Sequence, residues 1–377
     1  MILKGVTFPT KPSSDGYFHV YIKYEGKRRA IKDKTLEGLK RKYIEKYKSL
    51  HTKSFKEVFM LMCEEKLFRI RDEQKRHSTK NTIARYNSDY RRFFVGSDLE
   101  SMAIDKVTVK DIEAFVESCL NYHNLRRQGF MNIRTILNKT YQYAYKHEMA
   151  DNVTSRVDFK QFESMLIPSV KISERLHSDE EIEAMLSFIR EYNGGRGCLG
   201  RFALELQLLT GSREGEIPPL RWSDISCGCI NITREQLTVR EEARQYSVIV
   251  EHTKTSTDRR FPVTGEIKEY FNRLREYHKK RGIASEYLFP SKDGVIANHT
   301  IYTFYKNMCD KLEIPICADR KKGPHSFRRN HITKTINASN GNIMMAAKLY
   351  GNSVETIQKN YYDSLDMDEA RKVLESW

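Results

Sequence analysis

The sequence of 377 residues has little of what marks fibrous, disordered or disulfide-stabilised proteins. Its 19 Gly and 9 Pro are too few for a collagen-like repeat or a low-complexity chain, and 39% hydrophobic residues suffice for buried cores. The seven Cys are odd in number and scattered, and the close pair Cys227 and Cys229 has no second pair at metal-ligand spacing. We therefore expect neither a disulfide framework nor a zinc site.

Long hydrophobic runs are also absent. No stretch approaches the roughly 18 to 20 consecutive apolar residues of a transmembrane helix, and the mean hydropathy is −0.64. The first residues, MILKGVTFPTKPSSDGYF, lack the apolar segment and small-residue cleavage site of a secretory signal. We expect a cytoplasmic protein without a membrane partner.

The charge of the chain is strongly unbalanced toward lysine and arginine. There are 65 Lys and Arg against 50 Asp and Glu, a formal net charge of +15. Residues 1–50 hold 13 of the basic residues and 5 of the acidic ones, so +8 of the net charge lies in this short segment. Polyanions are the natural partners of such a chain. A concentrated basic segment is typical of a nucleic-acid-binding arm, and a solvated basic surface is the alternative.

The same segment has the pattern of a small sheet followed by a helix. Residues 17–24 predict a strand, residues 25–26 a tight turn, and residues 27–32 a partner strand. Apolar residues then recur at helical spacing, namely Leu36, Leu39, Tyr43 and Tyr47. We interpret residues 1–50 as a DNA-binding module of one β-sheet and one helix. A purely structural extension is the alternative.

From residue 53 to residue 155 the pattern is helical. Four apolar stripes keep the 3.6-residue period that burial of one helix face requires. They are Phe55, Val58, Phe59 and Met62; Ile83, Tyr86, Tyr90 and Phe94; Ile112, Phe115, Val116 and Cys119; and Ile133, Leu137, Tyr141 and Ala144. We predict a helical bundle over 53–155 whose aromatic residues form the core and are not platforms for stacked bases. Residues 155–175 lose the period and include Pro168, which predicts a linker.

A third domain is predicted over residues 170–377. It begins with the pattern of a helix capping box at residues 178–181, followed by apolar residues. A helix ending near Gly211, a strand pair at residues 247–251 and 260–263, and mainly helices to the last residue follow. The predicted fold class is multidomain and mainly α with small β-sheets, and the last domain is mixed α/β.

Four short motifs in this domain carry side chains suited to chemistry on a phosphate. In the first, Arg213 follows a glycine turn and Glu216 lies three residues later. In the second, Lys254 lies between the two predicted strands and would project from a hairpin tip. In the third, His325 and Arg328 are spaced i and i+3 and share one helix face. Each motif alone is more often structural than catalytic.

The fourth motif is Asn352, which precedes Tyr361 by nine residues. The four motifs, in this order, resemble those of the tyrosine recombinase family, the integrases of phages and conjugative elements. The resemblance covers residues 170–377. Ahead of it, residues 1–50 and 53–155 look like the arm-binding and core-binding domains of the longer integrases, which makes 170–377 the catalytic domain.

The resemblance implies a role for each of these residues. Arg213 and Arg328 match the two family arginines, and Tyr361 matches the nucleophile. The adjacent Tyr362, ten residues after Asn352, is the alternative nucleophile, since both spacings occur in the family. The other matching positions are the supporting acid Glu216, the hairpin lysine Lys254, and His325. Two features depart from the family: Asn352 stands where the family has His or sometimes Trp, and Pro218-Pro219 interrupts a helix that usually begins at the acid. Asn352 can form hydrogen bonds but is no proton donor near neutral pH.

The residue types fit the implied chemistry. A phosphodiester under attack gains charge on its non-bridging oxygens, and Arg213 and Arg328 stay charged and match phosphate geometry. His325, with an ordinary pKa near 6.5, could help take the phenolic proton, and Lys254 could protonate the departing 5′-oxygen. The product is a 3′-phosphotyrosine, which a 5′-hydroxyl can reseal. No metal or other cofactor is expected, and the sequence has no P-loop or carboxylate cluster.

The resemblance also implies partners. These are double-stranded DNA with core and arm sites, further copies of the chain in a tetramer that forms a Holliday junction, and accessory proteins that bend DNA or set the direction of exchange. The tail, residues 363–377, is similar to the segment that family members dock onto a neighbouring subunit, and an ordinary terminal helix is its alternative.

Two other functions are compatible with the same motifs. A type IB topoisomerase shares the catalytic residues, but the separate basic module at residues 1–50 favours an integrase, which bridges two DNA sites. A catalytically silent DNA-binding regulator of the same fold is the other alternative. The presence of all the catalytic residue types argues against it.

Overall fold

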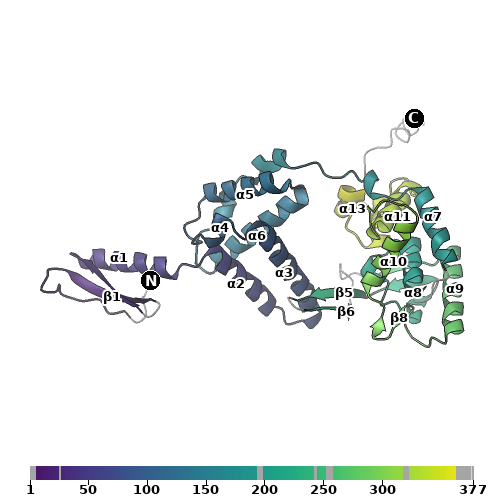
Figure 1. The fold of residues 1–377 in the computed structure, drawn as a ribbon, viewed down its shortest axis with the longest axis horizontal. Coiled ribbons are helices and arrows are strands. Elements are labelled where there is room, and N and C mark those ends of the chain that lie inside the picture. The colour runs from purple at the N-terminus through teal and green to yellow at the C-terminus, as the bar shows by residue number, and fades with distance from the viewer. Residues whose placement is uncertain are drawn as a thin grey trace. The chain divides into compact units, whose positions relative to one another are not determined.

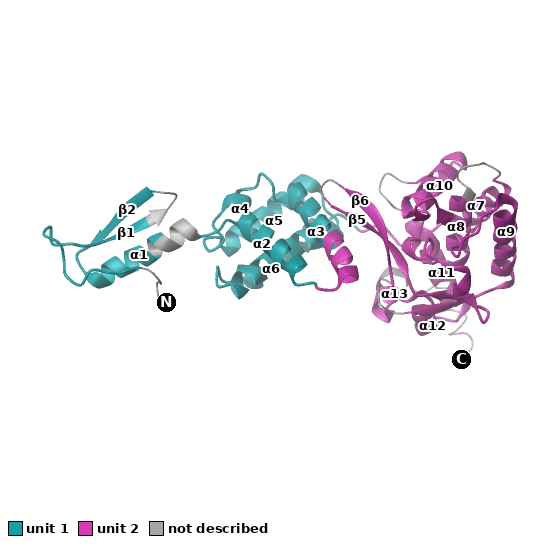
Figure 2. Cartoon of the chain, turned by 90° about the horizontal axis from the view of Figure 1, so that it is seen from below, with its two compact units in different colours: residues 1–70, 82–168 teal, residues 71–81, 169–377 magenta. Residues whose placement is uncertain are grey.

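The computed structural model describes residues 6–24, 27–192, 198–241, 244–251, 258–316, 322–361 and 375. The chain divides into two compact units, one of residues 1–70 and 82–168 and the other of residues 71–81 and 169–377 (Figures 1 and 2). Across the described ranges, no helix is both long enough and apolar enough to cross a membrane.

The first unit begins with the predicted sheet and helix. Strands β1 (Phe18–Tyr24) and β2 (Lys27–Asp33) pair antiparallel, and helix α1 (Leu36–His51) follows. Thr35 caps this helix by accepting a hydrogen bond from the Gly38 backbone amide. A small core of its own joins helix and sheet: Val20, Ile22, Leu39 and Tyr43. The predicted strands and helix are confirmed, and the predicted turn at residues 25–26 lies outside the described residues.

The remainder of the first unit is a bundle of helices. They are α2 (Phe55–Phe68), α3 (Glu73–Phe93), α4 (Asp98–Ser101), α5 (Val109–His123) and α6 (Arg127–Lys146). Residues 73–81 of α3 are counted with the second unit. Capping boxes at Ser54–Glu57 and Thr108–Asp111 fix where α2 and α5 begin. Most residues of the four predicted stripes are buried in one core, and Ile83 packs against it. The bundle and the core role of its aromatic residues are therefore confirmed.

Part of the predicted linker is folded. Two short 3₁₀ helices, η1 (Val153–Arg156) and η2 (Phe159–Met165), follow α6. Val157, Phe159 and Phe162 are buried in the core of the bundle, so the prediction of a linker is wrong over this stretch. A 3₁₀ helix has three residues per turn, so its apolar residues do not follow the 3.6-residue period.

The second unit is a helical domain with small sheets. Helix α8, at its centre, contacts α7, α9, α10 and α11. The capping box at residues 178–181 is present at the start of α7. The helices are η3 (Ser173–Arg175), α7 (Asp179–Glu191), α8 (Cys198–Thr210), η4 (Glu214–Glu216), η5 (Trp222–Asp224), α9 (Gly265–Arg281), α10 (Asn298–Lys311), α11 (His325–Ala338), α12 (Ile343–Tyr350) and α13 (Val354–Tyr361).

The strands of this unit pair differently from the prediction. They are β3 (Ile225–Ser226), β4 (Cys229–Ile232), β5 (Glu235–Arg240), β6 (Gln245–Val250), β7 (Arg259–Pro262), β8 (Pro290–Ser291) and β9 (Gly294–Val295). The expected hairpin of residues 247–251 with 260–263 is wrong: β6 pairs with β5, and β7 pairs with β4. Strand patterns in a sequence show where strands lie, but partners are chosen by contacts between distant segments. The two strands that flank Lys254 in the chain therefore belong to different sheets, and Lys254 itself lies outside the described residues.

The start of α3 belongs to the second unit because it contacts the hairpin of β5 and β6. Lys80 forms an ion pair with Glu241 at 2.7 Å. The side chain of Asn81 accepts a hydrogen bond from the Arg240 backbone amide at 3.2 Å. These polar contacts attach residues 71–81 to this hairpin.

Candidate active site

The site is built on the turn that ends α8. Gly211 adopts a left-handed backbone, with φ +60°, and a Cβ at this position would lie only 2.7 Å from Cβ of His331 on α11. Both facts require glycine. The Nε2 atom of His331 lies 2.6 Å from the Leu208 carbonyl oxygen, and this hydrogen bond joins α11 to the end of α8. The turn therefore brings α8 and α11 together and starts the segment that carries Arg213.

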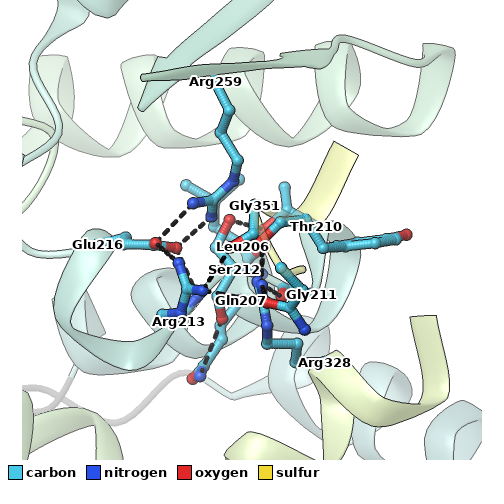
Figure 3. A network of polar contacts seen from close by, with 12 residues as sticks. Leu206, Gln207, Thr210, Gly211, Ser212, Arg213, Glu216, Arg259, Arg328 and Gly351 are labelled. Atoms are coloured by element: carbon cyan, nitrogen blue, oxygen red, sulfur yellow. Dashed lines mark hydrogen bonds and ion pairs between the residues drawn. The ribbon is translucent and has the colours of Figure 1, made fainter. Parts of the chain in front are cut away.

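Arg213 is held on two sides. Its Nη1 donates to Glu216 Oε1 at 2.9 Å, and its backbone amide donates to Glu216 Oε2 at 2.7 Å. Its Nη2 donates to the Gly351 carbonyl at 2.8 Å (Figure 3). The same Nη2 donates to Asn352 Oδ1 at 3.1 Å. These contacts use three of the five guanidinium N–H groups. The other two can serve a bound anion.

Arg328 enters the same site from α11. It is 1% exposed and is among the largest fully buried side chains of the described structure. Its Nη1 donates to the Gly211 carbonyl at 3.2 Å (Figure 3), and its Nη2 donates to the Tyr350 carbonyl. The carbonyls that end α8 and α12 thus fix this guanidinium in place.

Asn352 joins the two arginines. Its Oδ1 accepts from Arg328 Nη2 at 2.7 Å and from Arg213 Nη2 at 3.1 Å. Because a guanidinium only donates hydrogen bonds, the amide must present its oxygen to them, which turns its NH₂ group away as a donor. The residue that departs from the family pattern is therefore the acceptor shared by both guanidiniums.

Glu216 lies at the buried end of this network. It is 0% exposed, and the short helix η4 ends at it, so the chain does not begin a long helix there. The following Pro218-Pro219 is consistent with this early end. Burial alone would raise the pKa of Glu216, but hydrogen bonds from Arg259 and the charges of Arg259 and Arg213 hold it below the usual range. The carboxylate is therefore ionised at neutral pH.

Arg259, on β7, is a member of this network that the sequence motifs did not reveal. Its Nη1 donates to Glu216 Oε1 at 2.6 Å, and its Nη2 donates to Glu216 Oε2 (Figure 3). The Arg259 side chain is 3% exposed. From a sequence alone, an arginine at the start of a strand is expected to lie at the surface. A burial pattern for that strand would have been needed to indicate that Arg259 is buried.

His325 is the first residue of α11, one helical turn before Arg328, and its side chain is exposed. With Lys322 and Arg329 it lines a cavity of about 850 Å³. Lys322 is fixed near the start of α11 by Glu181, whose two carboxylate oxygens accept from its Nζ at 2.8 Å each. The third motif thus places one exposed and one buried basic side chain on α11.

The remaining predicted residues are described in part or not at all. Tyr361 is the last residue of α13, whose first turn begins directly after Asn352 and Ser353. Lys254 and Tyr362 lie outside the described residues, as does the tail after Tyr361 apart from one residue. In the described ranges, no group of three or more His, Cys, Asp or Glu side chains is placed to hold a metal ion.

A mainly helical chain that brings two arginines, an acid and the helix of a candidate nucleophile together has the architecture of a tyrosine recombinase. The chain belongs to the phage integrase family, whose model matches residues 175–367. The family inferred from the four motifs is therefore confirmed.

Several solved structures have a fold similar to that of this chain. The integrase of the Tn1549 transposon, in complex with a circular intermediate DNA, is 18% identical with a TM-score of 0.65, over 85% of this chain and 99% of that one. A lambda integrase tetramer bound to a Holliday junction is 14% identical with a TM-score of 0.58, over 97% of this chain and 98% of that one. The XerH recombinase in a pre-cleavage complex is 12% identical with a TM-score of 0.53, over 85% of this chain and 96% of that one. No curated protein sequence matches the chain significantly.

Proposed function

We propose that this protein is a site-specific DNA recombinase that integrates or excises a mobile DNA element. The observation that carries the proposal is the convergence of Arg213 and Arg328 on the amide oxygen of Asn352. Two fixed guanidiniums beside one another form a site for a single phosphodiester, whose non-bridging oxygens they can bind before the reaction begins. Glu216 supports the site by fixing one edge of Arg213.

The proposed reaction is a transesterification. The phenolic oxygen of Tyr361 attacks the scissile phosphorus, the bond from phosphorus to the 5′-oxygen breaks, and a 3′-phosphotyrosine forms. His325 assists removal of the phenolic proton, and Lys254 donates a proton to the departing 5′-oxygen. A 5′-hydroxyl of the partner strand reverses these steps. The phosphodiester energy is kept, so the exchange needs no nucleotide cofactor.

The proposed division of labour follows the three predicted domains. Residues 1–50 bind arm sites, residues 53–155 bind core sites, and residues 170–377 carry out strand exchange. Four copies act together on two DNA duplexes through a Holliday junction, and the tail of residues 363–377 docks onto a neighbouring copy. The similar lambda integrase, which is a tetramer bound to such a junction, supports this arrangement.

A trapped covalent adduct tests the proposal. A core-site duplex with a nick just beyond the scissile phosphate loses its short 5′-hydroxyl fragment after cleavage, so the protein stays attached to the DNA. We expect the parent protein and Tyr362→Phe to form the adduct, and Tyr361→Phe to bind the duplex without forming it. Mass spectrometry should locate the nucleotide on Tyr361. A nucleotide found on Tyr362 would contradict the choice of nucleophile and leave the recombinase proposal standing.

The same reagents separate the alternatives. A silent regulator binds the duplex and forms no adduct with any nicked substrate. A topoisomerase forms the adduct and relaxes supercoiled DNA but does not exchange strands between two duplexes. Joining of two labelled core sites into recombinant products is therefore the outcome that only the proposed function gives.

A further inference from the structure

The buried network contains one more positive charge than the candidate reaction uses directly. The network holds three guanidiniums, those of Arg213, Arg259 and Arg328, and one carboxylate, that of Glu216, which gives the cluster a net charge of +2. Arg213 and Arg328 meet at Asn352, where the proposed phosphate binds. In Figure 3, Arg259 approaches the Glu216 carboxylate from above and Arg213 approaches it from below.

The bonding of Glu216 shows what Arg259 does. Each oxygen of the carboxylate accepts two hydrogen bonds, one from Arg213 and one from Arg259. If Arg213 were the one cation bonded to this buried carboxylate, the negative charge of Glu216 would attract Arg213 alone. With Arg259 present, the negative charge is divided between two guanidiniums.

A second contact ties Arg259 to the same site. Gly351 has a left-handed backbone, with φ +59°, and a Cβ there would lie 3.5 Å from both Cδ and Nη1 of Arg259. The Gly351 carbonyl accepts from Arg213. Arg259 therefore packs against both groups that hold Arg213, the carboxylate and the glycine turn.

We infer that Arg259 is a positioning residue that neutralises Glu216, so that Arg213 keeps its charge for the scissile phosphate while Glu216 still fixes its orientation. The inference rests on the proposed function, because it concerns the same phosphate site. Without Arg259, Glu216 would compete with the phosphate for Arg213. The loss of cleavage in a variant without Arg259 would then come from the negative charge of Glu216 and not from the absence of the Arg259 side chain itself.

A double-mutant cycle on single-turnover cleavage of the nicked core-site duplex tests this. We expect Arg259→Met to slow cleavage about 100-fold, comparable to the loss of one preorganised donor, while DNA affinity changes by less than about threefold. Adding Glu216→Gln should restore cleavage by about tenfold or more, because the amide carries no charge to compete with the phosphate. If the losses of cleavage rate in the two single variants multiplied in the double variant, the inference would be overturned.

Two further variants keep the test decisive if Arg259→Met does not fold. Arg259→Lys keeps the positive charge and can donate to Glu216, so we expect cleavage within about tenfold of the parent. A folded Arg259→Lys protein that loses about 100-fold or more would rule out charge balance. The matched control is Arg273→Met, since Arg273 also binds a buried carboxylate, Glu205, which likewise accepts from a second arginine, Arg190. It should lower the free energy of unfolding without a comparable loss of cleavage.

The outcomes also separate this inference from the proposed function. If the folded parent protein forms no adduct on the nicked duplex, the proposed function fails. If the parent forms the adduct and Arg259→Met cleaves as fast as the parent, the proposed function stands and the inference about Arg259 fails.

Discussion

Replacing Asn352 with aspartate changes one atom type at the centre of the site. The side chain keeps its shape, but its oxygens now carry a negative charge 2.7 Å from Arg328 Nη2 and 3.1 Å from Arg213 Nη2. At an effective dielectric constant of about 20, the attraction to each guanidinium is about 5 kcal/mol before desolvation. Desolvation of the new carboxylate cancels most of it.

We therefore expect stability and activity to change in opposite directions. The free energy of unfolding of Asn352→Asp should rise by about 1 kcal/mol, because the carboxylate is a better acceptor for two guanidiniums than the amide. Cleavage should fall by about 100- to 1000-fold, because the carboxylate occupies and neutralises the groups that bind the phosphate. The net charge of the buried cluster would drop from +2 to +1.

Urea unfolding and single-turnover cleavage of the nicked duplex measure the two effects. The control is Asn352→His, which restores the usual family residue. A neutral imidazole can accept through one ring nitrogen and donate through the other, so we expect cleavage within about tenfold of the parent, a change in barrier of about 1.4 kcal/mol or less. If Asn352→Asp cleaved within tenfold of the parent, the two arginines could not be binding the phosphate beside Asn352.

Three other predictions concern different parts of the chain. Lys254→Ala should block cleavage of normal DNA. A DNA substrate whose bridging 5′-oxygen is replaced by sulfur, a leaving group that needs no proton, should restore cleavage by this variant. If the sulfur substrate is not cleaved, Lys254 is not the general acid. Removal of residues 1–50 should weaken binding to arm-site DNA and lessen its salt dependence, with core-site cleavage retained; unchanged arm-site binding would contradict a separate arm-binding role. Burial raises the pKa of Glu214 to about 7 from the ordinary 4.5. Between these pH values the folded protein holds a proton on Glu214 that the unfolded chain has lost, so the free energy of unfolding falls as the pH rises from 4.5 to 7. Glu214→Gln should remove that loss and gain about 1–2 kcal/mol on the parent between pH 4.5 and pH 7.5 in urea unfolding, after discounting for partial exposure; parallel pH profiles would refute the assignment.

Much of the fold could be predicted from local patterns. The stripe that begins at Phe55 is buried because a helix repeats every 3.6 residues, and the caps at Ser54 and Ser178 mark helix starts through side chains only three residues apart. Strands β1 and β2 are only two residues apart in the sequence, so neighbours in sequence are also neighbours in space.

What could not be predicted depends on contacts between distant segments. The partner of β6 is β5 and not β7, and nothing in the strand pattern alone distinguishes the two. The motifs indicated Arg213 and Arg328 as a pair, but their common acceptor is set by the turn after α12. Arg259 was missed because its partner, Glu216, lies 43 residues earlier in the chain.

The turn of Gly351 and Asn352 lies between α12 and α13, the helix that ends at Tyr361. Its carbonyl and amide oxygens hold Arg213 and Arg328 at 2.7–3.1 Å, and a shift of about 1 Å is enough to break such hydrogen bonds. A displacement of the start of α13 would thus disorganise the two arginines proposed to bind the phosphate as well as the proposed nucleophile. Under the proposed function, the cleavage chemistry would then be lost as a unit and not in graded steps, which would prevent cutting of DNA by a half-assembled site.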